Sequence, residues 1–259
     1  MRLDQKLTLL YPDLSRSKAQ DAIKEGLVKV NDQVITKSST KIEDDDRIEL
    51  QEPDLAFASR AGFKLYDVLD DFHIDLTNRI CMDVGASTGG FTDVCLQHGA
   101  AKVYSIDVGV DQLIKRLRED PRVVNMEHCN CRYLTKDMFE DKITFACMDV
   151  SFISVKLILP ALFEVLDQIE LVVLIKPQFE AGKQNIGKNG IVKDPKVHMA
   201  VLQDMVQFVA DQGYYISHLQ SSSILGRDGN KEFVMHITNQ PSQNIFDYKK
   251  IVKENLIKR

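Results

Sequence analysis

The stretch from Arg79 to Thr92, Arg-Ile-Cys-Met-Asp-Val-Gly-Ala-Ser-Thr-Gly-Gly-Phe-Thr, constrains the fold more than any other part of the chain. It has the pattern of a buried strand that ends in a glycine-rich turn and opens a helix. A strand–turn–helix unit of this kind points backbone N–H groups toward a ligand at the edge of a sheet. The stretch therefore predicts an α/β domain that binds a ligand above this turn.

A dinucleotide is the first alternative ligand, because G-x-G-x-x-G turns bind a pyrophosphate. Here Ser87 stands where the second glycine would be needed. An acidic residue suited to a ribose, Asp107, follows about 20 residues later. A nucleoside fits this pattern better, and S-adenosylmethionine is the nucleoside cofactor most often bound this way. On this motif alone, other Rossmann-type ligands and a purely structural turn stay open.

The alternation of apolar runs and amphipathic segments predicts the architecture around this turn. After a helix from 59 to about 72, we expect strands at 79–84, 102–107, 122–127, 143–149 and 170–175, with helices at 89–98, 110–118 and 155–167. A helix at 195–212 and an antiparallel pair near 214–219 and 231–237 follow. Continuous apolar strands such as 171–175 suit a parallel sheet covered on both faces. The prediction is a doubly wound, Rossmann-like α/β domain.

Four segments are expected along the chain. Residues 1–51 form a small α+β module: helices begin near Arg2 and at Ser15, a hairpin turns at Asn31-Asp32, and a strand covers 47–50. Residues 52–58 are expected to be a linker, 59–240 the α/β domain and 241–259 a polar tail. Residues 1–42 carry eight Lys/Arg and five Asp/Glu. On composition alone this excess favours an ordinary solvated helix face, and a phosphate-binding face is the alternative.

Composition excludes several other classes of protein. No apolar run approaches the roughly 18 residues of a membrane span, and the first residues lack the apolar core of a signal peptide. The five cysteines are an odd number and lie largely in apolar runs, which favours a reduced, cytoplasmic protein. Cys129-x-Cys131 has no second ligand pair, so we expect no metal. The 182–188 stretch nearly matches a P-loop, but Asn189 replaces the required Ser or Thr.

Charged residues directly flank the apolar segments near the expected open edge of the sheet: Lys64, Asp149, Lys176 and Glu232. Charged groups next to fully apolar strands are unusual unless they are paired. For each residue considered alone, the simpler explanation is that it is the first solvated residue beyond its strand. Considered together, they form a set with a recognisable order.

That set, with its flanking residues, resembles the TlyA-type ribosomal RNA methyltransferases, whose catalytic domain is FtsJ-like. The motifs are Ser-Arg-Ala-Gly-Phe-Lys-Leu at 59–65, Asp-Val-Gly-Ala-Ser-Thr-Gly-Gly-Phe-Thr at 83–92, Asp-Val-Ser-Phe-Ile-Ser at 149–154, Leu-Ile-Lys-Pro-Gln-Phe-Glu at 174–180 and Asn-Lys-Glu-Phe at 230–233. The first module, with Arg-Leu-Asp at 2–4 and Gly-Leu-Val-Lys-Val-Asn at 26–31, resembles the S4-type RNA-binding domain. Ala61 is the one departure, since this family usually has a second glycine there.

The resemblance implies a cytoplasmic enzyme that methylates a ribose 2′-hydroxyl, with cytidine in ribosomal RNA as the expected target. It implies a catalytic tetrad of Lys64, Asp149, Lys176 and Glu232, with Lys176 on the hydroxyl as base or as orienting donor. Expected S-adenosylmethionine-binding residues are Asp83, Gly85, Ala86, Ser87, Gly89, Gly90, Asp107 and Asn130, with Glu127 as an alternative to Asn130. Expected RNA-binding residues are Arg2, Arg16, Lys18 and Arg60. Ribosomal RNA or ribosomal subunits would be the partners.

Two other functions stay open at this point. One is an RNA-binding module whose α/β domain has lost its activity, although an intact tetrad argues against it. The other is a membrane-lytic protein, because members of this family are often labelled hemolysins. The sequence contains no amphipathic or membrane-spanning segment that supports this second alternative.

Overall fold

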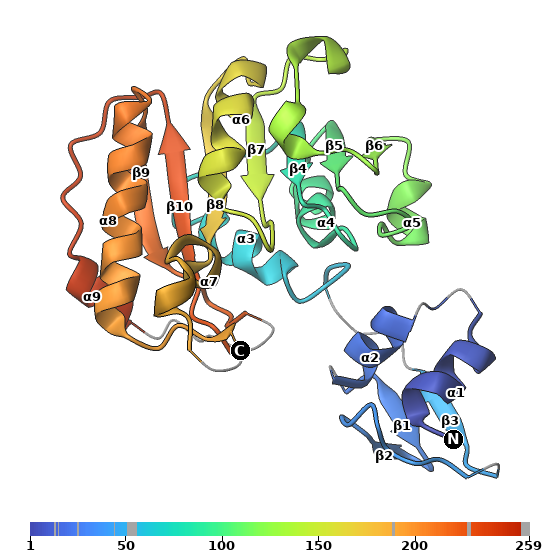
Figure 1. Ribbon diagram of the computed structural model, residues 1–259. Coiled ribbons are helices and arrows are strands. Elements are labelled where there is room, and N and C mark those ends of the chain that lie inside the picture. Colours follow the sequence, from blue (N-terminus) through green and yellow to red (C-terminus); the bar gives the residue numbers. More distant parts are fainter. Residues whose placement is uncertain are drawn as a thin grey trace. The chain divides into compact units, whose positions relative to one another are not determined.

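A computed structural model describes residues 1–12, 14, 16–24, 26–43, 45–50, 56–187, 190–226 and 229–254, without the side chains of 17, 18 and 21. The chain divides into two compact units, residues 1–56 and 57–259 (Figure 1). Most of the expected linker, the expected N-cap Ser15 and the last residues of the polar tail lie outside the described residues.

The first unit is a helix pair on a small antiparallel sheet. Helices α1 (Leu3–Leu10) and α2 (Arg16–Lys24) precede β1 (Val28–Val30), β2 (Gln33–Val34) and β3 (Ile48–Leu50), in the sheet order β2-β1-β3. Asn31 and Asp32 adopt left-handed φ values of 50° and 65°, the geometry of the tightest hairpin turns. Leu3, Leu7 and Ile23 are fully buried between helices and sheet. The predicted small α+β module is confirmed.

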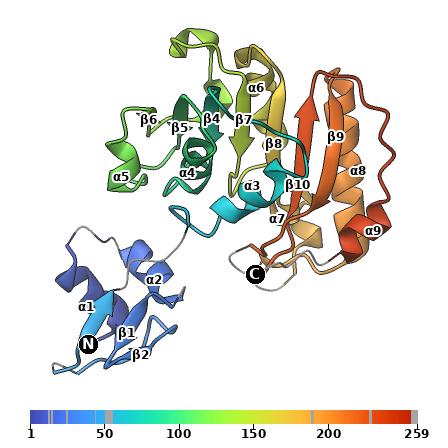
Figure 2. The same cartoon turned by 180° about the vertical axis from the view of Figure 1, so that it is seen from behind.

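The second unit is built on a seven-stranded sheet. Its strands are β4 (Ile80–Val84), β5 (Lys102–Ile106), β6 (Val123–Met126), β7 (Phe145–Met148), β8 (Glu170–Ile175), β9 (Tyr215–Ser221) and β10 (Phe233–Thr238). Their order is β6-β5-β4-β7-β8-β10-β9 (Figure 2). The first five run parallel, whereas β10 is antiparallel to both β8 and β9. The chain reverses its direction of winding between β5 and β7, so a ligand is expected beyond the carboxyl end of β4.

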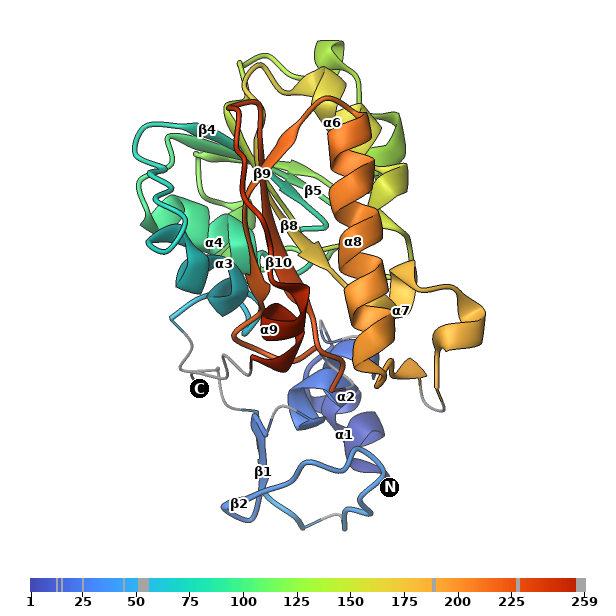
Figure 3. The same cartoon turned by 90° about the vertical axis from the view of Figure 1, so that its left-hand side faces the viewer.

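Helices cover both faces of this sheet (Figure 3). Helices α3 (Gly62–Leu69), α4 (Gly90–Gln97) and α5 (Lys115–Arg118) pack on one face. On the other lie α6 (Leu159–Val165), α8 (Pro195–Asp211) and α9 (Tyr248–Lys253). Alternate residues of β8 face the two layers, Val172 toward the first and Val173 toward the second, and both are fully buried. This two-sided burial explains the continuous apolar run in the sequence.

The helix expected at 110–118 is shorter than predicted. Only Lys115–Arg118 is helical, because the Glu127 carboxylate accepts hydrogen bonds from the backbone N–H groups of Asp111, Gln112 and Leu113 at 2.7, 2.7 and 3.0 Å. These bonds hold the preceding segment as a loop. The helix expected at 155–167 likewise begins with a 3-10 turn at Val155–Leu157 and ends at Val165.

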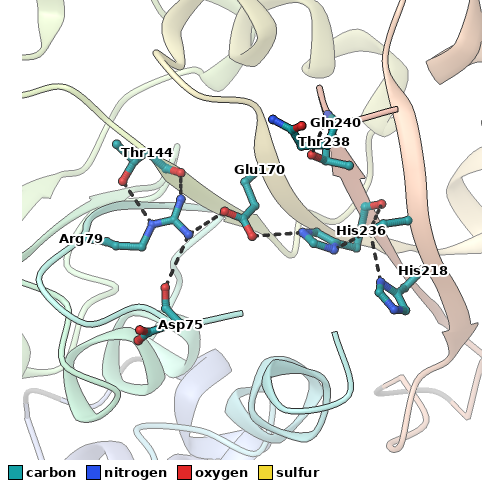
Figure 4. Close-up of polar contacts among 9 residues, drawn as sticks. Asp75, Arg79, Thr144, Glu170, His218, His236, Thr238 and Gln240 are labelled. Atoms are coloured by element: carbon teal, nitrogen blue, oxygen red, sulfur yellow. Dashed lines mark hydrogen bonds and ion pairs between the residues drawn. The ribbon is translucent and has the colours of Figure 1, made fainter. Parts of the chain in front are cut away.

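A network of ion pairs and hydrogen bonds connects β10 to the parallel strands (Figure 4). We call it the amino-end cluster, and its members are Arg79, Thr144, Glu170 and His236. Arg79 Nη1 lies 2.6 Å from Glu170 Oε2, and Arg79 Nε donates to Thr144 Oγ1 at 3.2 Å. Glu170 Oε1 lies 3.5 Å from His236 Nε2 on β10. Burial raises the pKa of Glu170, but its hydrogen bonds with His236 and Arg79 outweigh that effect and lower it. The cluster therefore stabilises the sheet from its amino-terminal edge.

Candidate active site

The four charged residues singled out in the sequence come from four separate elements. Lys64 lies in the first turn of α3, Asp149 follows β7, Lys176 follows β8 and Glu232 precedes β10. The register of the antiparallel pair places Phe233 opposite Ile175, which brings the adjacent Glu232 and Lys176 to the same edge. The carboxyl ends of parallel strands share that edge with the start of an antiparallel one. The fold therefore gathers all four, and we call them the carboxyl-end cluster.

These four side chains form a continuous chain of ion pairs. Lys176 Nζ lies 2.5 Å from Asp149 Oδ1, and Asp149 Oδ2 lies 3.2 Å from Lys64 Nζ. Lys64 Nζ also donates to Glu232 Oε2 at 2.6 Å. The residues Lys64, Lys176 and Glu232 are only 7%, 8% and 3% exposed. Lys176 and Glu232 are thus the two ends of a nearly buried, charge-balanced chain.

The electrostatics of the chain keep its inner members charged. Burial lowers the pKa of the Lys64 ammonium, but Asp149 and Glu232 outweigh burial and raise it. Burial raises the pKa of Asp149, but the ammonium groups of Lys64 and Lys176 outweigh burial and lower it. The sequence did not single out Ser151, whose Oγ accepts a hydrogen bond from Lys176 Nζ at 3.0 Å. Lys176 is therefore held on two sides.

The glycine-rich turn differs from expectation in how it uses its backbone N–H groups. The N–H groups of Gly85 and Ala86 both donate to Ile106 O, at 2.8 and 3.0 Å, and that of Gly89 donates to Ala86 O. The Ser87 N–H donates to Asp107 Oδ2 at 2.8 Å. The expectation that the turn points its N–H groups at a ligand is therefore wrong for these four groups. Their hydrogen-bond acceptors belong to Ile106 at the end of β5, to Asp107 and to the turn itself.

Two glycines let the turn pack directly against the carboxyl-end cluster. Gly85 has a φ of +83°, and a Cβ there would lie 2.8 Å from Asp149 O. A Cβ on Gly90 would lie 2.4 Å from Ser59 Oγ and 3.0 Å from Gly62 N, at the start of the helix that carries Lys64. Larger side chains at either position would separate the turn from the cluster. The predicted cofactor turn and the tetrad are therefore one packed unit.

Asp83, at the end of β4 just before the turn, has an unusual environment. It is 1% exposed, and its Oδ2 accepts hydrogen bonds from Thr92 N and Thr92 Oγ1, both at 2.7 Å. Its Oδ1 is buried and has no hydrogen-bond partner among the described residues. Burial raises the pKa of Asp83 to about 7, against the opposing effect of the Thr92 hydrogen bonds. A buried acceptor of this kind suits a cationic ligand group.

The other expected cofactor residues lie on the two neighbouring strands. Asp107 follows β5, and its Oδ1 accepts from Gly109 N at 2.7 Å in addition to the Ser87 bond. Asn130 lies beyond β6, where its Oδ1 accepts from Arg132 N at 3.1 Å. Glu127 is committed to the loop at 111–113. Asp107, Asn130 and the glycine turn all follow carboxyl ends of adjacent strands.

The first unit organises two of the expected RNA-binding residues around a buried carboxylate. Asp4 is completely buried and accepts from Arg2 Nε at 2.8 Å, Arg16 Nε at 3.2 Å and Gln20 Nε2 at 2.7 Å. The hydrogen bond from Arg2 is the largest cause that lowers the pKa of Asp4. The Arg2 and Arg16 side chains stay 42% and 56% exposed. Arg60 is exposed in the second unit, and the Lys18 side chain lies outside the described residues.

The sequence did not identify one exposed aromatic residue, Phe152, in the segment that follows Asp149. Phe152 is 90% exposed, has a φ of 65° and lies three residues after Asp149. Its ring centroid is 5.3 Å from that of Phe179, three residues after Lys176. Its place inside the Asp-Val-Ser-Phe-Ile-Ser motif was the available signal, but sequence alone does not show that the ring is solvent-exposed.

Known proteins share both units. A family model described as FtsJ-like methyltransferase matches residues 57–239, and one described as S4 domain matches residues 1–48. Bacillus subtilis YqxC, provisionally named an rRNA methyltransferase, is 45% identical over 86% of this chain and 80% of its own length. The Mycobacterium tuberculosis 16S/23S rRNA (cytidine-2′-O)-methyltransferase TlyA is 35% identical over 92% of this chain and 90% of its own length.

A solved structure agrees with these matches. A Streptococcus thermophilus protein, provisionally named a hemolysin, superposes with a TM-score of 0.77 at 41% identity, covering 97% of this chain and 94% of that one. Within the described part of the chain, no helix is both long and apolar enough to cross a membrane. The match over 57–239 covers more than half of the chain. The protein therefore belongs to the FtsJ-like methyltransferase family, with an S4 domain ahead of its methyltransferase domain.

Proposed function

We propose that this protein transfers the methyl group of S-adenosylmethionine to the 2′-hydroxyl of a cytidine ribose in ribosomal RNA. The observation that carries the proposal is the carboxyl-end cluster, in which Lys64, Asp149, Lys176 and Glu232 meet as one chain of ion pairs. Family membership and the name of the M. tuberculosis relative support the substrate. The S4 domain supports an RNA partner, and an enzyme that acts on ribosomal RNA would work in the cytoplasm.

The cofactor site of this proposal lies beyond the carboxyl ends of β4, β5 and β6. Asp83, with its unpartnered buried Oδ1, is suited to the cationic amino group of the methionine moiety. Asp107 would face the ribose and Asn130 the adenine. The glycine-rich turn would line the methionine moiety with Gly85, Ala86, Ser87, Gly89 and Gly90. When bound, S-adenosylmethionine supplies the electrophilic methyl group.

Lys176 is the residue we place on the acceptor hydroxyl. An ammonium has three N–H donors, and Asp149 and Ser151 account for two directions around this Nζ. The third would orient the 2′-oxygen toward the methyl group, and positioning of this kind is a large part of catalysis. In a 2.5 Å ion pair with Asp149, Lys176 acts as the charged, orienting partner.

RNA contacts are proposed at both units. Arg2 and Arg16 each use one edge of the guanidinium on Asp4 and present other N–H groups to solvent, an arrangement suited to phosphates. Lys18 and Arg60 are the other proposed phosphate contacts. The exposed ring of Phe152, the residue after the Ser151 that accepts a hydrogen bond from Lys176, is suited to stack on a base next to the reacting ribose.

Mass spectrometry of ribosomal RNA tests this function. Purified protein is incubated with unmethylated ribosomal RNA or subunits and S-adenosylmethionine carrying a deuterated methyl group. The expected product is deuterated 2′-O-methylcytidine, which is absent with the Lys176→Ala variant although that variant still binds the cofactor. Binding of RNA without any methylation would indicate a catalytically inactive RNA-binding protein. Equal methylation by wild type and Lys176→Ala would remove the tetrad from the mechanism.

A further inference from the structure

Asn230 is a buried polar residue that the proposed chemistry does not use. It is 3% exposed and lies two residues before Glu232. Its Nδ2 donates to Gly190 O at 3.0 Å, and its Oδ1 accepts from Val192 N at 3.0 Å. One carboxamide therefore satisfies a donor and an acceptor of the 190–193 segment, which follows Lys176 in the chain. An asparagine carries both functions at this length.

The two connected segments are fixed by further contacts on each side. His198 Nε2 donates to Val192 O at 3.0 Å, and the His198 ring packs edge-on against Phe233 at 5.6 Å. On the other side, Gly226 N donates to Asn230 O at 2.8 Å. A Cβ on Gly226 would lie 2.3 Å from Glu232 Oε1, so the backbone packs directly against this carboxylate. The orientation of Glu232 thus depends on where the backbones of Gly226 and Asn230 are held.

We propose that Asn230 is a positioning residue that couples the segment after Lys176 to the segment before Glu232. Glu232 is one end of the ion-pair chain, and Asn230 joins Gly190 and Val192 to the backbone two residues before it. Holding the 190–193 segment in place keeps Glu232 Oε2 at 2.6 Å from Lys64. The inference rests on the proposed methyl transfer and adds a residue that acts through Glu232 without touching substrate or cofactor.

A double-mutant cycle on the full-length protein tests this coupling. Asn230→Ala and Asn230→Asp are each made alone and combined with Glu232→Gln, and kcat, the KM for ribosomal RNA and cofactor affinity are measured. Leaving buried groups such as Gly190 O and Val192 N without a partner costs about 10- to 100-fold in an equilibrium constant. We therefore expect Asn230→Ala to lower kcat by that factor while KM and cofactor affinity change less than about threefold. Asn230→Asp keeps the acceptor for Val192 N, so its kcat should lie between those of wild type and Asn230→Ala.

The cycle separates positioning from folding. If Asn230 acts through Glu232, Asn230→Ala in the Glu232→Gln background lowers kcat by less than about threefold. Asn185→Ala is the control, because it removes one exposed hydrogen bond to Ala181 O nearby and should leave kcat within about twofold. Additive losses, or a wild-type kcat for Asn230→Ala, overturn the inference. If Asn230→Ala does not fold, the cycle with Asn230→Asp decides by the same criterion.

The proposed function and this inference fail in different ways. A wild-type protein that transfers no methyl group overturns both. An active wild type with an additive cycle overturns only the role of Asn230.

Discussion

Two ionic clusters, one nearly buried and the other half-buried, lie at opposite ends of the same strand pair, β8 and β10. The amino-end cluster joins Arg79, Glu170 and His236, and the carboxyl-end cluster joins Lys176 to Glu232 through Asp149 and Lys64. Both contain an acid flanked by two basic groups. They differ in how fully their donors and acceptors are occupied by the protein itself.

In the amino-end cluster, neutral groups also form hydrogen bonds with the charged side chains. The Arg79 guanidinium donates to Thr144 Oγ1 and to the carbonyl oxygens of Thr144 and Asp75 in addition to Glu170 (Figure 4). His236 Nδ1 pairs with Ser217 Oγ at 2.6 Å, and Phe72 stacks on the His236 ring at 5.8 Å. The Arg79 guanidinium and His236 Nδ1 therefore have little capacity left for a ligand, whereas His236 Nε2 has no hydrogen-bond partner among the described residues and lies 3.5 Å from Glu170 Oε1. This cluster holds the sheet together.

The carboxyl-end cluster is almost entirely ionic, and only Ser151 adds a neutral side-chain partner to Lys176 among the described residues. It packs against a glycine turn and lies near a carboxylate with an unpartnered oxygen. Buried charges with capacity left for further partners are costly for stability and mark functional sites. Burial and charge alone therefore do not identify a site. At the carboxyl end, the packing against the glycine turn and the unpartnered Asp83 Oδ1 close to it indicate one.

The largest expected effect follows from removing the central cation of the carboxyl-end cluster. Lys64→Met leaves the carboxylates of Asp149 and Glu232 without the ammonium that they share. Breaking a buried ion pair in this way costs about 3–5 kcal/mol, and methyl transfer should be lost as well. Urea unfolding and the methylation assay measure the two losses. A variant as stable as the wild type would show that the cluster is well solvated.

A smaller, purely structural effect is expected at the other end of the strands. Glu170→Gln keeps the shape but weakens the bonds to Arg79 and His236, so we expect a loss of about 1–3 kcal/mol in unfolding free energy. The pKa of Glu170 is lowered in the folded protein, so its stabilisation is present above the unfolded pKa of about 4 and is lost as pH falls through the folded value. Acid unfolding should therefore be less steep in the variant. Methyl transfer should stay within about threefold of wild type, and a larger loss would connect the two clusters.

A change in cofactor affinity with pH is expected from Asp83. With a pKa of about 7, the carboxyl group is largely neutral at pH 5.5 and half ionised at pH 7, so affinity for the cationic cofactor should rise about tenfold over this range. Asp83→Asn should bind more weakly and without this pH dependence, as calorimetry can measure. The raised pKa also means that this group stabilises the ligand-free protein at low pH and loses that contribution as pH rises through about 7. A flat wild-type profile would contradict the role of Asp83.

The smallest effect is expected at the neutral partner of Lys176. Ser151→Ala removes one hydrogen bond to an ammonium that Asp149 still holds. We expect kcat to fall about threefold to tenfold, with KM unchanged, because a neutral partner contributes about 1 kcal/mol. Steady-state kinetics with ribosomal RNA measure this loss. A loss as large as that of Lys176→Ala would make Ser151 essential to the chemistry.

Much of this architecture could be predicted from the sequence because its signals are local. Continuous apolar runs such as 171–175 marked the parallel strands, and the Asn31-Asp32 turn marked the first hairpin. The loop at 110–114 could not be predicted, because it depends on Glu127, a residue more than ten positions away that binds its backbone N–H groups. The periodicity of a segment does not show that a distant side chain accepts hydrogen bonds from its backbone.

The candidate site could be predicted only as a set of residues, through a family resemblance. Which of them touch depends on the register of β8 against β10, and that register is a long-range property. The amino-end cluster escaped prediction for the same reason. So did Asn230, whose partners are backbone groups about 40 positions away.

The most direct test of the account compares one variant from each cluster, Lys176→Ala and Glu170→Gln, in single-turnover methyl transfer and in thermal unfolding. We predict that Lys176→Ala lowers the transfer rate at least about a thousandfold and also lowers the unfolding temperature, since Asp149 loses one of its two ammonium partners and keeps only Lys64. Glu170→Gln should lower the unfolding temperature and leave the transfer rate close to that of wild type. Full activity in Lys176→Ala, or a comparable loss of activity in both variants, would contradict the separation of a catalytic end from a structural end.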